Sequence, residues 1–376
     1  MKLVFISNYF NHHQKPLSDA FYQKLGDDYV FVQTIEMEKE RINMGWSMST
    51  LPPYVKSLYI DSEHDECIRY INEADAVIYG SAPSYLLNKR KRANKLIFGY
   101  SERPLKRSES FVQVFLRSIK WHIVYSKRKS TYMLCASAYT AHDYALMGLF
   151  KGKTYKWGYF PETKTYDNVE RLLNKKKKGT ILWVARFLDW KHPELPIKLA
   201  KKLSEKSYDF SLDMIGVGEE FEKIKALIEE YNLAEKVHLL GSMPPEMVRE
   251  HMEQSEIFVF TSDRNEGWGA VLNESMNSGC AVVANEAIGS VPFLIKDGYN
   301  GCIYADGNFE DLYKKVTSLL ENSEKRLLLG KNAYATIVKQ WNADVASKNF
   351  IELYNHIKNG EFTNEINDAP CAPDYQ

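Results

Sequence analysis

The sequence predicts an α/β protein built from two Rossmann-like domains in tandem, with a ligand crevice between them. Its 376 residues are many for a single hydrophobic core. Short apolar runs of strand length alternate with helical stretches, which is typical of parallel sheets with crossover helices. The alternation stops at the lysine run 175–178 and then begins again, so we interpret this run as a solvated linker between two domains.

The first domain is expected to cover residues 1–170. Its apolar runs predict strands at 3–6, 29–33, 76–79, 96–100 and 133–136, with a helix at 17–25. A final helix at about 345–360 is expected to return to this domain and complete it. Residues 361–376 are polar and contain Pro370 and Pro373, which predicts a disordered tail.

The second domain is expected to cover residues 179–344, and its alternation is cleaner. We predict strands at 180–185, 210–215, 237–240, 257–260 and 281–284, and helices at 194–203, 219–231, from 245, at 271–278, 309–320 and 324–340. This pattern predicts a doubly wound sheet, in which ligands bind at the carboxyl ends of the strands.

The composition narrows the function classes. Lys and Arg together number 49, as do Asp and Glu, so the chain has no overall attraction to nucleic acid, and none is expected as a partner. The five cysteines are odd in number and lack C-x-x-C spacing, which favours buried thiols in a reducing cytoplasm. The N-terminal apolar segment is too short for a signal peptide, and no run approaches the length of a membrane span.

The most informative segment is 261–274, which follows a predicted strand and opens a helix. It places Glu266 and Glu274 eight positions apart around Gly267, Trp268 and Gly269. A strand, a glycine turn and a helix start can present backbone N–H groups to a phosphate. The two acids can hold sugar hydroxyls, so this segment predicts a site for a phosphorylated sugar.

Basic residues follow the first strand of the same domain. Arg186 leaves that strand and Lys191 lies five positions later, a pair that suits a diphosphate or is simply two exposed bases. Gly216 and Gly218 form a G-x-G turn. This turn either approaches a nucleotide or is a turn between a strand and a helix that requires positive φ. Residues 285–292 either shape a sugar pocket or form a turn.

These elements in this order resemble glycosyltransferase family 4, whose members are nucleotide-sugar-dependent retaining enzymes with the GT-B fold. The resemblance covers residues 180–345 and rests on Arg186, Lys191, Glu266, Glu274, Ser278-Gly279, Gly289-x-Val291-Pro292 and Asp297-Gly298-x-Asn300-Gly301. The family commonly has a glutamate directly after the Gly-x-x-Pro element, where this chain has Phe293.

The resemblance implies a role for each matching residue. Arg186 and Lys191 would neutralise the diphosphate of a UDP- or GDP-linked donor, and Glu266 would contact its sugar at the reacting centre. Gly267, Trp268 and Gly269 would offer backbone N–H groups, Glu274 would accept bonds from the ribose, and Gly216 and Gly218 would lie on the donor side. Such enzymes need no metal or other cofactor, and no D-x-D motif stands where it could bind one.

The acceptor would belong to the first domain. His12, His13 and Gln14 follow the first strand, and either contact the acceptor or form a capped loop with one histidine packed inward. Glu102 follows the strand 96–100 and either orients an acceptor hydroxyl or forms a local salt bridge with Arg103.

Residues 89–129 are strongly basic, with thirteen Lys and Arg against two Glu, a net charge of +11. The stretch 111–121 within them is aromatic and amphipathic. Basic residues around such a stretch suit an anionic membrane surface, while the simpler interpretation is a core helix with a solvated basic face.

We therefore expect a hexosyl- or N-acetylhexosaminyltransferase that moves a sugar to a glycan or lipid-linked acceptor in cell-surface polysaccharide synthesis. It would be cytoplasmic or peripheral at the inner membrane face. The alternatives are a GT-B nucleotide-sugar epimerase and a non-catalytic glycan-binding subunit. An NAD oxidoreductase is disfavoured because no G-x-G-x-x-G follows the first strand.

Overall fold

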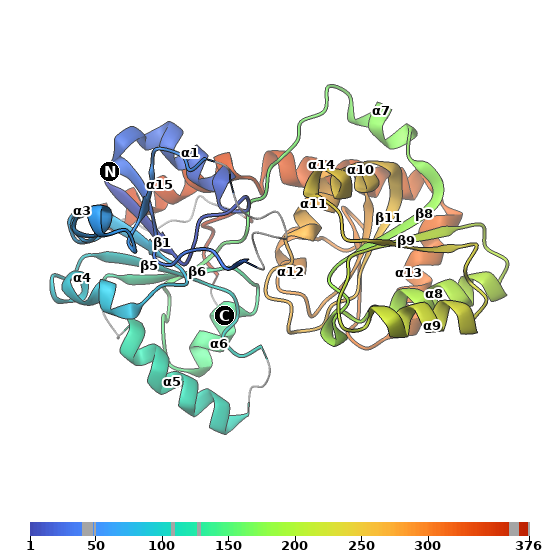
Figure 1. The fold of residues 1–376 in the computed structure, drawn as a ribbon, viewed down its shortest axis with the longest axis horizontal. Coiled ribbons are helices and arrows are strands. Elements are labelled where there is room, and N and C mark those ends of the chain that lie inside the picture. Colours follow the sequence, from blue (N-terminus) through green and yellow to red (C-terminus); the bar gives the residue numbers. More distant parts are fainter. Residues whose placement is uncertain (40–47, 49, 107–109, 126–128, 361–367, 375–376) are drawn as a thin grey trace. The chain divides into compact units, whose positions relative to one another are not determined.

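The protein forms two compact α/β units, as the computed structural model shows (Figure 1). It describes residues 1–39, 48, 50–106, 110–125, 129–360 and 368–374. The first unit comprises Met1–Glu162 and Asn342–Gln376, and the second comprises Thr163–Trp341. Residues 163–170, expected in the first domain, and the lysine run 175–178, expected as a linker, lie within the second unit. The predicted fold class is confirmed, because each unit is built on a parallel sheet with helices around it.

The first sheet has the strand order β3-β2-β1-β4-β5-β6-β7, and all neighbours are parallel. Its strands are β1 (Leu3–Ser7), β2 (Tyr29–Gln33), β3 (Val55–Ser57), β4 (Ala76–Tyr79), β5 (Leu96–Ser101), β6 (Thr131–Cys135) and β7 (Thr154–Lys156). Every residue of β1, β2 and β4 is buried, as expected for strands covered on both faces. The edge strands β3 and β7 were not predicted, because three residues are too few to give a periodic pattern.

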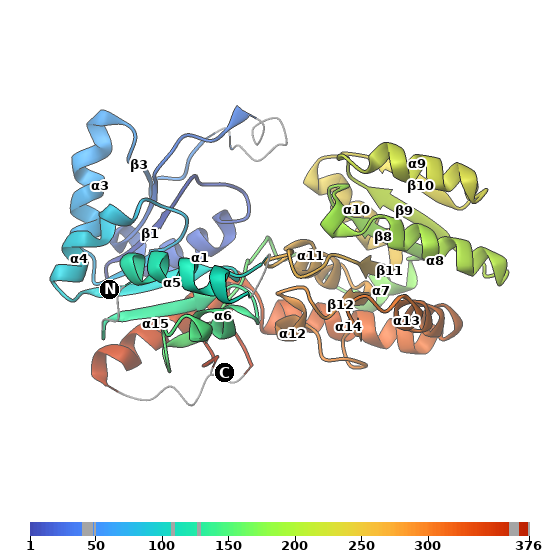
Figure 2. The same ribbon diagram turned by 90° about the horizontal axis from the view of Figure 1, so that it is seen from below.

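Helices cover both faces of this sheet. They are α1 (Lys15–Leu25), α3 (Asp61–Glu73), α4 (Asn88–Arg92), α5 (Phe111–Tyr125), α6 (Thr140–Leu146) and α15 (Ala343–Asn359). On one face α15 packs beside α1, and the ring of Phe350 lies 5.5 Å from that of Phe21 and 4.9 Å from that of Phe98. On the other face α3, α5 and α6 supply core residues, and Figure 2 shows α5 and α6 in front of the sheet.

The second sheet has the order β10-β9-β8-β11-β12-β13 and is also parallel throughout. Its strands are β8 (Lys177–Val184), β9 (Ser211–Ile215), β10 (Val237–Gly241), β11 (Ser255–Phe260), β12 (Ala281–Asn285) and β13 (Cys302–Tyr304). The predicted strands are all present, and the short edge strand β13 is additional.

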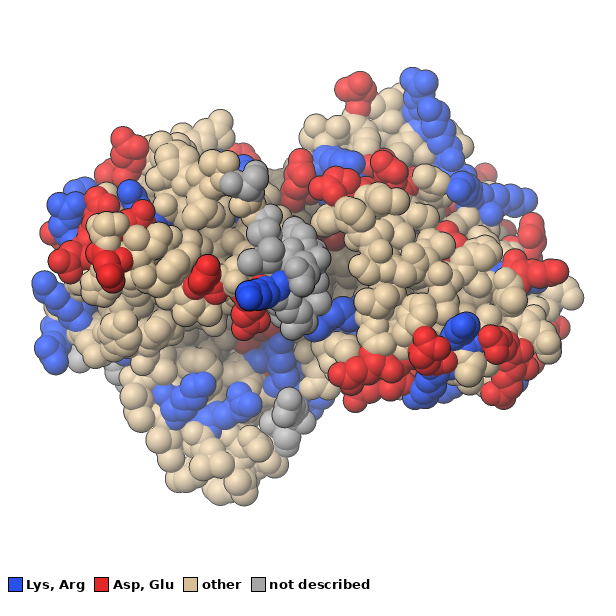
Figure 3. Space-filling model, viewed as in Figure 1, with Lys and Arg blue, Asp and Glu red and all other residues tan. Residues whose placement is uncertain are grey.

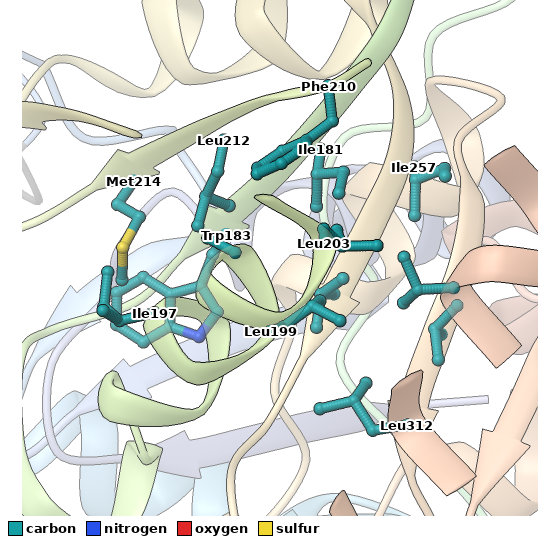
Figure 4. Packing of buried hydrophobic residues seen from close by; sticks show 14 of the residues in the cluster. Ile181, Trp183, Ile197, Leu199, Leu203, Phe210, Leu212, Met214, Ile257 and Leu312 are labelled. Carbon is teal, nitrogen blue, oxygen red and sulfur yellow. The ribbon is translucent and has the colours of Figure 1, made fainter. Parts of the chain in front are cut away.

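The helices of the second unit are α7 (Val169–Asn174), α8 (Glu194–Glu205), α9 (Phe221–Glu230), α10 (Pro245–Gln254), α11 (Val271–Asn277), α12 (Val291–Leu294), α13 (Phe309–Glu321) and α14 (Ser323–Lys339). Helices α8, α9 and α13 cover one face of the sheet, and α10, α11 and α14 cover the other (Figure 1). Under the first group lies an apolar core in which Trp183 of β8 packs beside Ile197 and Met214 (Figure 4). This core fixes β8, from whose end the first candidate site loop leaves.

The lysine run is not the linker that the sequence predicted, although Lys175, Lys177 and Lys178 are exposed to solvent as expected. Lys177 and Lys178 open β8, and the ammonium group of Lys176 is buried, donating to the carbonyl oxygens of Met252 at 2.8 Å and Ser255 at 2.9 Å. Desolvation lowers the pKa of Lys176. An ammonium group that caps carbonyls needs no carboxylate partner, which explains how a lysine is tolerated inside the unit.

The predicted disordered tail is wrong for residues 368–374. Residues 361–367 and 375–376 lie outside the described residues, but Cys371 is fully buried and Pro373 forms an antiparallel bridge with Tyr155 of β7. The backbone N–H of Cys371 donates to the carbonyl of Lys156 at 2.7 Å. This segment thus supplies backbone partners to the edge of the first sheet, which its polar composition concealed.

All five cysteines are free and buried. In the part of the chain that the structure describes, none of the helices has the length and apolar character needed to cross a membrane.

Candidate functional site

Two loops at the carboxyl ends of neighbouring strands are bonded together in the second unit. The first follows β8 and carries Lys191, and the second follows β11. The hydroxyl of Thr261 accepts a bond from the indole N–H of Trp183 at 2.9 Å and donates to the carbonyl of Lys191 at 2.7 Å. The N–H of Asp263 donates to the carbonyl of Trp190 at 3.0 Å. The buried Trp183 therefore anchors both loops.

The predicted donor residues Lys191 and Glu266 form an ion pair across these loops. Their side chains are only 12% and 10% exposed, respectively. The ammonium group also lies 4.2 Å from the ring centroid of Trp190. A nearly buried charge is tolerated when it is paired, so each group stabilises the other while no other charge competes for it.

Arg186 lies on the same edge and is exposed, two residues beyond the end of β8. The glycine turn after β9 packs directly on the backbone beside it. A Cβ on Gly216, whose φ is +135°, would lie 1.9 Å from the carbonyl oxygen of Ala185, and one on Gly218 would lie 2.4 Å from that of Phe187. The structure therefore gives both glycines a packing role that shapes the loop of Arg186.

The buried side chain of Trp268 holds the Gly-Trp-Gly turn in place. The side chain of Trp268 is fully buried, and its N–H donates to the Asn273 side chain at 2.8 Å. Gly269 has φ +77°, and a Cβ there would lie 2.5 Å from the ring of Phe260. The indole is thus a structural anchor, which leaves only the backbone of this turn to meet a ligand.

Phe293, which stands where the resembled family has a glutamate, belongs to an aromatic cluster. Its ring stacks on Trp341, with centroids 5.8 Å apart and an interplanar angle of 17°, and lies 6.3 Å from Trp268. At this position the chain therefore has an aromatic ring that packs against the anchor of the Gly-Trp-Gly turn.

Glu274 lies in α11 and is partly buried. Desolvation raises the pKa of its carboxyl above that of a solvated glutamate, and the charge of Arg249 only partly opposes this. Arg249 was not predicted. It is buried and donates to the carbonyl of Glu274 at 3.1 Å and to the side chain of Asn277 at 2.9 Å, so it fixes the end of the helix that carries Glu274.

A third positive group on this edge, His192, was also missed. Its Nδ1 lies 3.1 Å from a carboxylate oxygen of Glu194, and its Nε2 lies 3.6 Å from one of Asp263. Hydrogen bonds to Asp263 and then to Glu194 raise the pKa of His192 to about 10, so it is protonated at neutral pH. No local spacing could reveal it, because Asp263 comes from a different loop.

The first unit contains a cavity of about 860 Å³ at the carboxyl ends of β1, β4 and β5. The predicted acceptor residues His13, Gln14 and Glu102 line it, whereas His12 does not. Its other walls include the aromatic residues Tyr79, Tyr100, Trp121, Tyr125 and Tyr159, and the basic residues Arg103, Lys106, Arg117 and Lys120. Aromatic walls with a few convergent polar groups are typical of ligand sites.

Specific partners hold the charged side chains Glu102 and Arg103 of this cavity in place. Glu102 pairs with Lys106 and accepts a bond from the hydroxyl of Tyr159 at 2.8 Å. The expected alternative, a salt bridge between Glu102 and Arg103, is not formed, because Arg103 pairs at 3.0 Å with the buried Asp143. Glu102 is thus positioned at the cavity and Arg103 supports the wall.

His13 and Gln14 offer different groups to a ligand in this cavity. Burial and then the neighbouring His12 lower the pKa of His13 to about 3, so its ring is neutral at physiological pH. The side-chain oxygen of Gln14 is buried and has no hydrogen-bond partner among the described residues. Such an orphaned acceptor, lining a cavity, suits a hydroxyl or amide donor on a ligand.

Among the residues that the structure describes, there is no group of three or more His, Cys, Asp or Glu side chains arranged to hold a metal ion.

Comparison with known proteins agrees with this geometry. Residues 166–336 match the model of the family described as glycosyl transferases group 1. An uncharacterized glycosyltransferase of Methanocaldococcus jannaschii is 29% identical over 188 residues, which are 49% of this chain and 47% of that protein. The N,N'-diacetylbacillosaminyl-diphospho-undecaprenol alpha-1,3-N-acetylgalactosaminyltransferase of Campylobacter jejuni is also 29% identical, over 49% of this chain and 46% of its own.

The chain thus spans about half the length of these curated relatives. Among solved structures, Anabaena HepE in complex with UDP and glucose superposes with a TM-score of 0.66 and 14% identity, covering 94% of this chain and 99% of HepE. At that identity the likeness concerns the fold, and it extends over both units. The protein therefore has the GT-B fold, and residues 166–336 of its second unit are similar to the glycosyl transferases group 1 family.

Proposed function

We propose that this protein is a retaining glycosyltransferase that uses a UDP- or GDP-linked sugar without a metal. The observation that carries the proposal is the nearly buried Lys191–Glu266 pair, whose lysine shares one loop at the carboxyl edge of the second sheet with Arg186 and the protonated His192. Three positive groups from one loop suit a diphosphate that displaces the carboxylate partner of Lys191, and we assign Glu266 to the sugar attached to that diphosphate.

The chemistry follows from the charges. When the nucleotide diphosphate leaves, negative charge develops on its oxygen, and fixed positive groups stabilise that charge in place of a metal. Donor phosphates would compete with Glu266 for Lys191. The released carboxylate would then accept bonds from the sugar and stabilise the oxocarbenium-like carbon. Glu274, positioned through Arg249, would accept a bond from the ribose. Retention would follow from attack by the acceptor hydroxyl on the face that the phosphate leaves, with the departing phosphate taking the proton of that hydroxyl.

We assign the acceptor to the cavity of the first unit. Glu102 would orient the attacking hydroxyl, because Lys106 and Tyr159 fix its carboxylate. His13, neutral at physiological pH, and the orphaned oxygen of Gln14 would bond to other hydroxyls. The transferred group would be a hexose or an N-acetylhexosamine, and the aromatic walls would pack against the rings of a glycan acceptor.

The setting we propose is the cytoplasm and the inner face of the membrane, in cell-surface polysaccharide or glycolipid synthesis. The name of the Campylobacter jejuni relative supports this, because it describes transfer of N-acetylgalactosamine to a sugar on diphospho-undecaprenol. The cavity volume of about 860 Å³ supports an acceptor larger than a monosaccharide.

A thermal-shift screen with UDP- and GDP-sugars tests the donor site. At least one is expected to raise the melting temperature, and Arg186→Ala is expected to abolish that shift. The matched control is Lys225→Ala, which removes an exposed charge from α9 of the same unit and should leave the shift unchanged. The absence of a shift with every donor, or equal loss in both variants, would refute the donor site.

Glu266→Gln separates transfer from binding. It should keep the donor shift and lower the transfer rate by about 10²-fold or more, because the carboxylate is assigned to the reacting sugar. Nucleotide release that requires an acceptor supports transfer. Release without any acceptor, or interconversion of the nucleotide sugar, would instead favour hydrolysis or the epimerase alternative.

A further inference from the structure

Helix α5 of the first unit exposes a continuous apolar face. Phe111 is 84% exposed, Phe115 57% and Ile123 71%. The full set of exposed apolar residues on this helix is Phe111, Val112, Phe115, Leu116, Ile119 and Ile123. At about 100° per residue these positions fall within an arc of roughly 140°, a single apolar stripe along the helix. An apolar stripe of this kind normally faces a core, and here it faces away from the unit's own core.

The opposite side of α5 is the side that holds it to the protein. Val124 and Tyr125 are buried, and Trp121 stacks on Tyr125 with centroids 5.5 Å apart. This inner side also lines the cavity, to which Arg117 and Lys120 bring positive charge. One helix therefore has an apolar face turned outward and a cavity wall turned inward.

The charge around the stripe is of one sign. The sequence of α5, FVQVFLRSIKWHIVY, contains no acid, and Lys120 borders the stripe with its ammonium group 5.0 Å from the ring centroid of Trp121. Figure 3 shows the surface over α5 as mostly tan, with blue patches of Lys and Arg and no red of Asp or Glu. Basic residues beside an exposed apolar stripe are the features of a helix that lies in an anionic bilayer interface.

Two residues of the basic region 89–129 serve a different purpose. Arg90 is fully buried and donates to the carbonyl oxygens of Ile71 and Ala74, both at 2.8 Å, and of Leu96 at 2.7 Å. Lys91 is also buried. These two residues of α4 hold the fold together and are unavailable to a membrane, so the charge count of the sequence overstated the basic surface.

We propose that α5 docks the protein on an anionic phospholipid bilayer, with the apolar stripe among the acyl chains and Lys120, which lies between the stripe and the cavity side of the helix, at the level of the head groups. Charge favours this occupant over a second copy of the chain, because a symmetric pair of α5 helices would bring like charges together. Since α5 also walls the cavity, docking keeps the cavity within about one helix diameter, roughly 10 Å, of the head groups. If the proposed transferase function holds, the acceptor of this site is a membrane lipid whose head group carries the accepting hydroxyl.

Vesicle sedimentation with the full chain tests the docking. The protein is expected to bind vesicles of phosphatidylcholine with about one third phosphatidylglycerol, and to bind less to pure phosphatidylcholine or at high salt. The variant Phe115→Glu/Ile119→Glu should lower the partition coefficient by about tenfold or more, because two charges enter the apolar stripe. Leu328→Glu, at a 56% exposed position of α14 in the other unit, is the matched control and should bind like wild type.

The outcomes separate the explanations. Absent binding to anionic vesicles, or equal binding by both variants, would overturn the proposal. A dimer in light scattering that the double variant dissociates would instead assign the stripe to a second copy, and would also overturn it. The thermal shift with donor sugar should survive the double variant, so a failure of docking can be distinguished from a failure of the donor site.

Discussion

The close approach at Gly216 gives the sharpest structural prediction. A Cβ added there would lie 1.9 Å from the carbonyl oxygen of Ala185, so the variant Gly216→Ala requires a movement of about 1.5 Å to reach an ordinary contact of 3.4 Å. The obstacle is backbone, and the loop that would move carries Arg186. We therefore expect Gly216→Ala to lower both the stability of the second unit and its affinity for a nucleotide sugar.

The magnitude can be estimated from two contributions. Overpacking against an unyielding neighbour costs about 1–3 kcal/mol. A non-glycine residue at positive φ adds about 1–2 kcal/mol. The second unit extends over Thr163–Trp341, a size at which each kcal/mol lowers the melting temperature by about 2–4 °C. The expected decrease in the melting temperature is therefore about 4–20 °C.

Calorimetry of the full chain measures this effect, and Gly307→Ala supplies the control. Gly307 has φ +70°, but a Cβ there would meet no atom within 4 Å, so this variant carries only the backbone strain. Gly216→Ala should melt about 2–12 °C below Gly307→Ala and should show a smaller donor shift. Melting temperatures that agree within about 1 °C would refute the claim that the glycine turn is packed on the loop of Arg186.

Three further predictions concern single side chains. Because the pKa of His192 is raised to about 10, the stability that its charge contributes should be present below pH 6.5 and lost as the pH rises through about 10. The difference in melting temperature between wild type and His192→Asn should therefore shrink between pH 6.5 and about pH 10. Burial raises the pKa of Asp374 to about 6, so the folded state favours its protonated form, and Asp374→Asn should resist urea better than wild type at pH 7 but not at pH 4. Trp268→Ala should cost about 3–5 kcal/mol in urea unfolding, because a fully buried ring is lost, and Trp268→Phe should cost less. A Trp268→Ala variant as stable as wild type would contradict the anchoring role of the indole.

Much of the fold could be predicted because its central strands are continuous apolar runs, as buried parallel strands must be. The edge strands β3, β7 and β13 have three residues each and no pattern of their own; they are defined by a neighbouring strand. Lys176 shows another limit. Its charge predicted solvent, but the carbonyl oxygens that hold it belong to residues more than 70 positions away.

The candidate site could be predicted as a set of residues on one sheet edge, because parallel strands bring their carboxyl ends together. The pairing of Lys191 with Glu266 could not, since the two are 75 residues apart and their contact depends on how Trp183 and Thr261 join the loops. The sequence identified the amphipathic stretch of α5 but left open whether its apolar face meets a membrane or the core. Helical periodicity identifies an apolar face without showing whether that face meets the core.

The return of α15 to the first unit has a consequence for synthesis on the ribosome. The rings of Phe21 on α1 and Phe98 on β5 lack their packing partner until Phe350 has been translated. The intervening Thr163–Trp341 takes about 10–35 s to make at about 5–20 residues per second. During that time the second unit can fold while the nascent first unit still exposes aromatic residues. We expect a chaperone to bind the chain during this interval. The interval is unavoidable, because α15 is translated only after the whole second unit.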